Sequence, residues 1–382
     1  MNILESRVIC RQPGRYIGWP CVATTPDGGL VAVFSGDRDE HVCPFDKTYL
    51  ARSEDNGATW SEPESINDTP FDDRDAGVCC CADGTLVVSW FTSHYQSYDP
   101  IFERYRSAGR LRPEDKARWD KELGQVTQDE IERWNFVEVP GENTRWLGYW
   151  IRRSPDGGRT WEDPVATPCS APHGPNVLAD GSLFYVGTKN HDRENRRTTL
   201  AAAESRDQGR TWNVLAEANA FPEYIGDAPD GYAYLTEPHV VEATPGHLVA
   251  MARHEEVPRD PNRDRCVLWQ FDSEDGGKTW TKPRETQIWG KPPHLLKLRD
   301  GRLLVTYGHR RAPFGQRACF SYDEGRTWDY DNEVILRDDA ASGDLGYPAT
   351  AECAGGALLT VYYQIDREGE KPSLMMTRWE SE

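Results

Sequence analysis

One eight-residue pattern, S-x-D-x-G-x-T-W, occurs five times in this chain of 382 residues. The first copy is SEDNGATW, and the others are SPDGGRTW, SRDQGRTW, SEDGGKTW and SYDEGRTW. The copies begin at Ser53, Ser154, Ser205, Ser273 and Ser321. Four-stranded units that repeat every forty to fifty residues are typical of the blades of a β-propeller. The pattern therefore predicts a ring of similar sheets.

A second landmark lies upstream of the eight-residue boxes. It is an apolar stretch, a glycine turn and another apolar stretch, as in CVATTPDGGLVAVFSG and LLKLRDGRLLVTYG. Such alternation around Asp-Gly turns predicts β-hairpins. Counting this landmark gives six units, which begin near Trp19, Asp75, His173, Glu237, Pro292 and Tyr347.

The two ends of the chain fit together as one blade. The last unit has no box, and the N-terminal stretch with RVIC has no unit of its own. We therefore expect the N-terminal strand to complete the last blade, which removes an open sheet edge. The prediction is an all-β fold, a six-bladed β-propeller that forms a single domain over residues 1–382.

The boxes themselves are interpreted as structural joints. The Asp can accept backbone N–H groups within a tight turn, and the Gly can adopt the positive φ that the turn needs. The Trp offers a large apolar face to the neighbouring blade. Calcium loops are the rival interpretation, but such loops need more carboxylates at fixed offsets.

A long segment, about 95–145, interrupts the second blade after its second strand. Its central part, RLRPEDKARWDKELGQVTQDEIERW, is rich in helix formers, and Thr127 with Glu130 forms a capping-box pattern. We expect a helical insertion. It either shapes a pocket at one end of the propeller or forms a solvated decoration.

Charge and cysteine usage exclude several classes of partner. The formal net charge of −19 argues against nucleic acid or an anionic membrane surface. MNILESRVIC lacks the pattern of a signal peptide, and no apolar run approaches the length of a membrane span. We expect a cytoplasmic protein with reduced thiols. No CxxC pair occurs, which argues against a structural zinc site, and the oligomeric state does not follow from the sequence.

Aligning the six units predicts which side chains face the mouth of the central channel. In four units a Pro lies ten residues before the Leu that follows the hairpin turn. The residues just before these prolines are Trp19, Glu237, Pro292 and Tyr347, and the matching residue of the second unit is Asp75. Because the innermost strands of all blades start at the same mouth, we expect a carboxylate and a phenol to share one cavity.

The repeated boxes in a six-bladed propeller resemble the sialidase (neuraminidase) superfamily. The resemblance covers the whole chain except the helical insertion. TEPHVVEATPGHLVAMAR resembles the family segment that carries an activating Glu and a sugar-binding Arg, which correspond to Glu237 and Arg253. GYPATAECAGGALLTVYYQ resembles the segment that carries the nucleophile, which corresponds to Tyr347. A phenol with a pKa near 10 becomes a useful nucleophile when a nearby carboxylate takes its proton.

The resemblance implies a retaining exo-glycoside hydrolase that acts on a terminal acidic sugar, sialic acid or a relative, of a glycan. Two other functions stay open. A polysaccharide lyase or an atypical glycosidase on the same scaffold would use Tyr and His for proton transfer. A non-catalytic carbohydrate-binding propeller would bind sugar without Tyr347.

Several family positions are altered in this sequence. The first carboxylate-binding Arg is replaced by Gly18, so Arg15 and Arg74 are the candidate donors there. In the fifth blade GHRRAPFGQRACF offers Arg310, Arg311 and Arg317, of which we take the last two as candidates. The acid/base Asp falls on His41, with Asp37 and Asp39 nearby, and the choice among these three stays open.

Further polar and aromatic residues are predicted to contact the sugar. Candidates for binding are Asp75, Trp19, His239 and His294. Other residues at strand ends are His94, His173, His191, His254 and His309, and further aromatic candidates are Tyr16, Tyr232 and Tyr234. Converging imidazoles can bind a metal, but no pair has the spacing of a known metal motif. We therefore expect neither a metal nor another cofactor.

Overall fold

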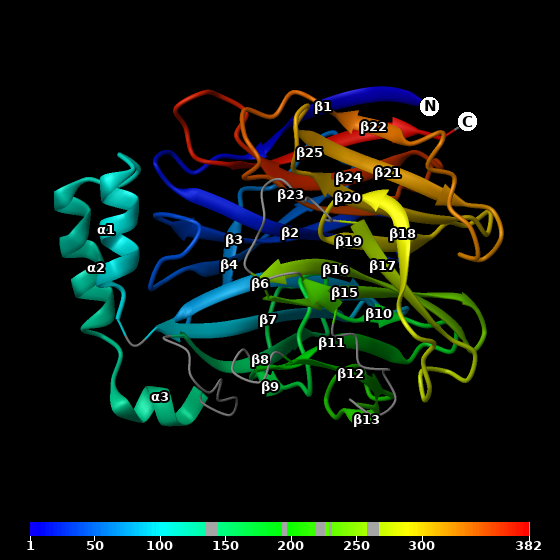
Figure 1. Ribbon diagram of the computed structural model, residues 1–382, viewed down its shortest axis with the longest axis horizontal. Coiled ribbons are helices and arrows are strands. Elements are labelled where there is room, and N and C mark those ends of the chain that lie inside the picture. The colour runs from blue at the N-terminus through cyan, green and yellow to red at the C-terminus, as the bar shows by residue number, and fades with distance from the viewer. Residues whose placement is uncertain are drawn as a thin grey trace.

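The structure is a computed structural model that describes residues 1–95, 97–134, 144–192, 197–217, 226–228, 231–257 and 267–381. Within these ranges the strands form six antiparallel sheets, and the described helices all lie in one segment. Figure 1 shows the sheets in sequence around the molecule, with the helices together on one side. The side chains of His191 and Tyr232, two of the candidates above, lie outside the described part.

In blades 1 to 5 the strands follow chain order from the centre of the ring outward, and in blade 6 the first strand of the chain is the outermost. Blade 1 contains β2 (Tyr16–Thr24), β3 (Leu30–Arg38), β4 (Lys47–Ser53) and β5 (Glu64–Asn67). Blade 2 contains β6 (Asp72–Cys80), β7 (Leu86–Tyr95), β8 (Thr144–Ser154) and β9 (Val165–Ala166). Blade 3 contains β10 (Asn176–Val177), β11 (Leu183–Asp192), β12 (Arg197–Ser205) and β13 (Asn213–Ala216).

The other three blades include a five-stranded sheet and the closing sheet. Blade 4 contains β14 (Gly226–Ala228), β15 (Gly231–Thr244), β16 (His247–Val257), β17 (Val267–Ser273) and β18 (Arg284–Trp289). Blade 5 contains β19 (Pro293–Lys297), β20 (Leu303–His309), β21 (Gly315–Ser321) and β22 (Val334–Arg337). Blade 6 contains β23 (Gly346–Glu352), β24 (Leu358–Gln364), β25 (Ser373–Glu380) and β1 (Asn2–Cys10).

The ring closes as expected, because the first strand of the chain is the outer strand of the last blade. β1 pairs with β25 in antiparallel register, from Asn2 opposite Glu380 to Cys10 opposite Leu374. The two termini consequently lie close together in Figure 1. The prediction of a six-bladed propeller is confirmed.

The boxes are joints between neighbouring blades, as predicted. In the blade 4 copy the Ser273 hydroxyl accepts the Gly277 N–H at 2.8 Å, and Asp275 accepts the Thr279 N–H at 2.9 Å. Gly277 has a φ of 88°, and a Cβ there would lie 2.2 Å from the Phe184 ring of blade 3. The other four copies share the Ser–Gly and Asp–Thr bonds, and their glycines pack on the preceding blade in the same way.

The opposite end of the ring carries a β-bulge in four innermost strands. The register breaks at the same point in blades 1, 2, 4 and 6. Each bulge places one non-glycine residue at positive φ, namely Trp19 (50°), Asp75 (57°), Glu237 (50°) and Tyr347 (50°). A left-handed backbone costs such residues roughly 1–3 kcal/mol and is concentrated at functional sites. Bulges re-aim side chains, and here they turn four side chains toward one mouth.

The insertion forms the helices α1 (Asp99–Ser107), η1 (Pro113–Asp115), α2 (Lys116–Leu123) and α3 (Gln128–Trp134), between β7 and β8. The expected helical insertion in blade 2 is thus confirmed. Thr127 accepts the Glu130 N–H at 3.2 Å, which supplies half of the expected capping box. Phe102, Tyr105 and Trp119 pack with residues of the loop after β3 in a separate small core, which fixes the helices on the propeller.

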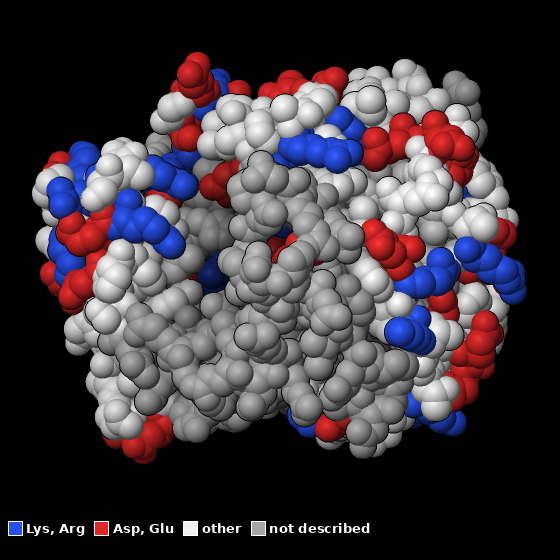
Figure 2. Space-filling model, in the orientation of Figure 1, with Lys and Arg blue, Asp and Glu red and all other residues white. Residues whose placement is uncertain are grey.

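Charges of both signs are interspersed on the helices at the left of Figure 2. No helix in the described ranges is long and apolar enough to cross a membrane. The nine cysteines that the structure describes form no disulfide with one another.

Candidate active site

A cavity of about 620 Å³ opens at the end of the ring that carries the bulges. The propeller contributes His41, Arg74, Asp75, Phe91, Glu237, Arg253, Arg310, Gly343, Asp344 and Tyr347, and the insertion contributes Arg104, Tyr105, Ala108 and Arg110. The size is that of a pocket for a small molecule or a sugar. The insertion therefore shapes the pocket, which decides between the two interpretations given above.

Tyr347 and Glu237 meet in this cavity. The Tyr347 hydroxyl donates a hydrogen bond to Glu237 Oε1 at 2.6 Å, and Arg253 Nη1 binds Glu237 Oε2 at 2.7 Å. Burial opposes ionisation of Glu237, but Arg253 and the Tyr347 hydrogen bond prevail and lower its pKa. Burial and the charge of Glu237 raise the pKa of Tyr347 well above its ordinary value. At neutral pH the pair is thus a protonated phenol beside an ionised carboxylate.

A second ion pair holds Arg253 in place. Its guanidinium also binds Glu255 Oε1 at 2.5 Å, and Lys291 Nζ binds the same carboxylate at 2.9 Å. These alternating charges lie in a row behind Glu237. The row fixes the Glu237 carboxylate against the phenol, since each end of the Arg253 guanidinium has its own acidic partner.

Two further guanidiniums face the cavity with unused donors. Arg310 lies 5.5 Å from the centre of the Tyr347 ring, and its Nε and Nη2 are buried without a hydrogen-bond partner. Arg74 lies over the Trp19 ring at 4.4 Å, and its Nε is likewise unpartnered. Buried polar groups are normally hydrogen-bonded, so these donors are placed for an acceptor that enters the cavity. A carboxylate fits such planar donors in a bidentate manner.

Asp75 is a buried carboxyl in the cavity wall. It is 7% exposed, and its Oδ1 has no hydrogen-bond partner. Burial raises the pKa of Asp75 to about 7, with Glu237 adding to the rise and Arg74 opposing it. A carboxyl that keeps its proton near neutral pH can donate a hydrogen bond to a substrate oxygen.

His41 belongs to a three-residue polar chain at the cavity wall. The Tyr16 hydroxyl donates to Asp344 Oδ1 at 2.7 Å and lies 2.9 Å from His41 Nδ1. Burial opposes ionisation of Asp344, but the hydrogen bonds with His41 and Tyr16 lower its pKa below the ordinary value. Burial lowers the pKa of His41 to about 4, a shift that Arg74 increases and Asp344 opposes. The imidazole is therefore neutral at pH 7.

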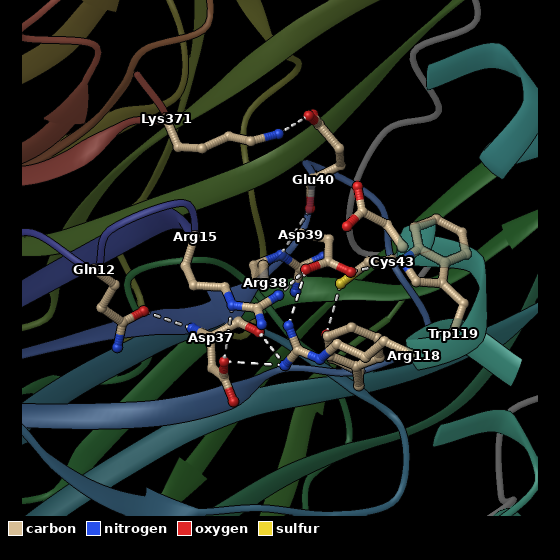
Figure 3. Close-up of polar contacts among 12 residues, drawn as sticks. Gln12, Arg15, Asp37, Arg38, Asp39, Glu40, Cys43, Arg118, Trp119 and Lys371 are labelled. Carbon is tan, nitrogen blue, oxygen red and sulfur yellow. Dashed lines mark hydrogen bonds and ion pairs between the residues drawn. The ribbon is translucent and has the colours of Figure 1, made fainter. Parts of the chain in front are cut away.

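The two aspartates considered beside His41, together with Arg15, lie outside the cavity. Asp39 binds Arg15 and accepts from Arg118 at 2.9 Å, and Asp37 accepts from Arg118 at 3.0 Å. Trp119 of α2 donates to Asp39 at 2.8 Å. Figure 3 shows this network between the end of β3 and the helix. These carboxylates and Arg15 anchor the insertion, and none of the three residues lines the cavity.

The two arginines taken from blade 5 are also directed away from the cavity. Arg311 covers the Trp289 ring at 4.3 Å and donates to His309 at 3.3 Å. Arg317 is buried at the outer side of its blade, where it binds the Arg337 carbonyl and lies 3.6 Å from Glu333. The blade 5 guanidinium of the cavity is instead Arg310, which directly follows β20.

Trp19, His239 and His294 do not line the cavity. Trp19 is 1% exposed and lies between the guanidiniums of Arg38 and Arg74. The rings of His239 and His294 stack at 4.6 Å beneath the cavity floor, next to His173. These residues support the site from behind, and Tyr16, also fully buried, holds His41. Within the described residues no group of acidic, His or Cys side chains is arranged to hold a metal ion.

Several residues of the cavity were not found by sequence reasoning. Asp344 lies three positions before Tyr347 in the stretch SGDLGYP, and nothing in its spacing distinguishes it from other surface acids. Arg104, Tyr105 and Arg110 belong to the insertion, which no repeat alignment can place. Arg310 was one of three arginine candidates in the stretch GHRRAPFGQR, and the sequence pattern did not separate them.

The chain belongs to the BNR repeat-like domain family, whose sequence model matches residues 2–234. The comparison with curated protein sequences gave no match. Solved structures share the architecture, which confirms the resemblance to sialidases at the level of the propeller fold.

Three of these structures illustrate the range. A protein of unknown function from Dyadobacter fermentans is 23% identical, with a TM-score of 0.75, over 100% of this chain and 99% of that chain. The NanB sialidase from Streptococcus pneumoniae is 13% identical, with a TM-score of 0.65; the match covers 98% of this chain and 70% of NanB. The intramolecular trans-sialidase from Ruminococcus gnavus is 12% identical, with a TM-score of 0.63; the match covers 100% of this chain and 98% of the trans-sialidase. At these identities the likeness concerns the fold.

Proposed function

We propose that the protein is a retaining exo-glycoside hydrolase that removes a terminal acidic sugar from a glycan, with Tyr347 as nucleophile. The observation that carries this proposal is the 2.6 Å hydrogen bond from Tyr347 to Glu237 in a cavity faced by guanidiniums of three blades. A Tyr–Glu pair is a known variant of the two-carboxylate arrangement of glycosidases. A neutral phenol also avoids the repulsion that a carboxylate nucleophile meets from an anionic substrate.

Binding and attack follow from the described side chains. The carboxylate of the sugar is held by the unused donors of Arg74 and Arg310, with Arg253 beside them. Asp75 binds a sugar hydroxyl or ring substituent. As the Tyr347 oxygen bonds to the anomeric carbon, its proton passes to Glu237, whose lowered pKa leaves it ionised and ready to accept. Water then attacks the glycosyl-tyrosine, and two displacements retain the anomeric configuration.

A second candidate is a polysaccharide lyase, favoured by one observation. His41 faces the same cavity as a neutral imidazole and can abstract a proton next to a sugar carboxylate that arginines neutralise. Its product would carry a carbon–carbon double bond that absorbs in the ultraviolet. Hydrolysis yields no such absorbance, so the product spectrum separates the two.

The test is a panel of chromogenic acidic glycosides, including N-acetylneuraminic acid and uronic acids, with wild type and Tyr347→Phe. We expect turnover by the wild type and a loss of at least about 10³-fold in the variant, since the nucleophile is removed. Tyr363→Phe is the matched control, because it removes another buried hydroxyl of the same aromatic cluster without touching Glu237. Undiminished hydrolysis by Tyr347→Phe would refute the proposal, and sugar binding without turnover by the wild type would indicate a binding propeller.

A further inference from the structure

His41 lines the cavity and stands at the position where sialidases, the family that the sequence resembles, carry their acid/base aspartate. We infer that His41 exchanges the proton of the leaving group through Nε2, and that Tyr16 and Asp344 are positioning residues that orient its ring. The inference rests on the proposed function. It replaces the expected choice among His41, Asp37 and Asp39 with a single assignment, since both aspartates bind Arg118 outside the cavity.

The hydrogen-bond directions determine the tautomer of His41. Asp344 has a lowered pKa, so it is an ionised acceptor, and the single proton of the Tyr16 hydroxyl is donated to it. The Tyr16 oxygen must then accept from His41 Nδ1, 2.9 Å away. With the proton on Nδ1, Nε2 of the neutral ring carries a lone pair. Among the described residues only Nδ1 has a polar protein partner, and the side chain is 35% exposed to the cavity.

The aromatic packing allows the ring only small movements. The Trp19 ring meets the His41 ring edge-on at 5.0 Å, and Tyr16 meets it at 5.7 Å. Arg110 of the insertion lies 3.4 Å from Asp344 Oδ2, so the carboxylate behind Tyr16 is itself held on its second oxygen. The chain from insertion to imidazole therefore holds the His41 ring in the cavity wall that it shares with Tyr347.

The proton balance closes over two steps. In the first, the bond from the anomeric carbon to Tyr347 forms, the bond to the leaving oxygen breaks, Glu237 takes the phenol proton and protonated His41 gives its Nε2 proton to the leaving oxygen. In the second, water attacks the anomeric carbon and gives a proton to His41, the bond to Tyr347 breaks, and Glu237 returns its proton to the phenol. The sum is glycoside plus water to sugar plus alcohol, with every residue restored.

The charges around His41 connect its proton to substrate binding. Titratable groups that face it or its partners are Tyr16 on β2, Arg38 on β3, Arg74 on β6, Tyr363 on β24, Arg110 of the insertion and Asp344. Burial and the two guanidiniums Arg74 and Arg38 lower the pKa of the free ring, and Asp344 raises it. A substrate carboxylate that binds Arg74 cancels part of this positive field. The bound substrate thus raises the pKa of His41 toward its ordinary value, although burial, the largest cause of the lowering, remains, so the protonated ring that acts as acid is the minor form at neutral pH.

The experiment compares two leaving groups on the sugar that the wild type hydrolyses, a nitrophenolate and a plain alcohol or sugar. We expect His41→Gln to lower kcat/KM at least about 100-fold for the alcohol and less than about 5-fold for the nitrophenolate, which departs without a proton. Equal losses for both substrates would overturn the inference. Loss of nitrophenolate turnover in Tyr347→Phe tests the proposed function separately, so the two failures are distinguishable.

A second variant tests the positioning residues and does not require that His41→Gln folds. Tyr16→Phe keeps the ring but removes the link to Asp344, which lowers the pKa of His41. We expect the basic limb of the pH profile of kcat/KM to move to lower pH, and the alcohol substrate to lose about 10-fold more activity than the nitrophenolate. Tyr362→Phe, whose hydroxyl lies 2.9 Å from Thr377 and outside the cavity, is the control and should leave both readouts unchanged. An unmoved limb with an unchanged leaving-group ratio in Tyr16→Phe would overturn the inference.

Discussion

The two ends of the propeller solve the same backbone problem with different residues. At the box end, positive φ falls on the box glycine of each copy, such as Gly277 and Gly325, and in three copies also on the non-glycine residue before it, Asn56, Gln208 or Glu324. The Ser and Asp side chains of the box satisfy the turn. At the cavity end, positive φ falls on Asp75, Glu237 and Tyr347, each with a different chemistry. The first arrangement repeats the same residue types from blade to blade. The second varies them, and some of its buried donors and acceptors, such as Arg310 Nη2 and Asp75 Oδ1, lack partners.

The comparison shows how a repeated fold separates stability from function. Each of the five boxes lies at one blade boundary and packs its glycine against the preceding sheet, so its residues are set by this packing. The bulges are equivalent in backbone but differ in side chain, with Trp19, Asp75, Glu237 and Tyr347 at matching positions. The strain at this end is tolerated only because closed sheets surround it.

The separation of function from stability is tested most directly by substituting one acidic residue at each end of the propeller. Glu237→Gln should lower kcat/KM by about 10²–10⁴-fold, since a general base is removed, with little change in melting temperature. Asp275→Ala in the blade 4 box should leave kcat/KM within about 3-fold and lower the melting temperature, since its two bonds to Thr279 are lost. Kinetics and thermal unfolding of both variants measure this. A box variant that loses turnover while keeping its melting temperature would contradict the separation.

Two glycine substitutions test how tightly the box packs against the preceding blade. Gly277→Ala should lower the free energy of unfolding by about 2–4 kcal/mol, because it adds a left-handed strain and a clash with the Phe184 ring. Gly246→Ala is the matched control, with a φ of 85° and open space around the new methyl group. It should lower the free energy of unfolding by only about 1 kcal/mol, the strain alone. Denaturant unfolding measures both, and equal effects would show that the joint is not tightly packed.

The cavity side makes the opposite prediction for stability. Asp75→Asn should raise the free energy of unfolding at pH 8 by about 1–3 kcal/mol, although it weakens substrate binding. The folded pKa of Asp75 is about 7, against a usual value of 3.8. Its stabilising contribution is therefore complete below pH 3.8 and is lost as the pH rises through 7. The gain from Asp75→Asn should vanish near pH 4, and a gain that is independent of pH would refute this account.

The smallest effect is a difference in the pH window of stability. Burial lowers the pKa of His294 to about 3, and burial with the charge of His294 lowers that of His173. These rings favour the folded state when neutral, so stability falls as the pH drops below 6.5. Hydrogen bonds from Thr59 lower the pKa of Asp55 to about 2, so the boxes lose stability only below pH 3.8.

His173 allows the pH dependence of the unfolding free energy to be tested with a single substitution. Both ring nitrogens of His173 lack partners, so His173→Phe removes one titrating group and leaves no donor unsatisfied. The slope of the unfolding free energy between pH 6 and 4 should decrease by up to about 1.4 kcal/mol per pH unit. Asp55→Asn should leave that slope unchanged and alter the one below pH 3.8. Identical slopes in wild type and His173→Phe would show that another group causes the acid sensitivity.

The sequence predicted those features of the fold that repeat from blade to blade. Blade number, ring closure and the role of the boxes follow from repeated turns and alternating strands. The meeting of Glu237 and Tyr347 follows from equivalent positions in two blades, since equivalent residues lie at the same height in the channel. The same alignment could not choose Arg310 over Arg311, because these residues follow the end of β20, where the strand alternation no longer predicts direction.

What the sequence by itself determined is therefore the ring and the residues that each blade presents at its bulge. Tertiary structure alone decided which loop side chains join them: Asp344 and Tyr16 behind His41, and the wall that the insertion adds. The physical reason is the separation in sequence of the residues that are in contact. Repeats encode contacts between neighbouring blades, whereas the polar chain of His41 connects residues more than three hundred positions apart through hydrogen bonds that have no periodic signature.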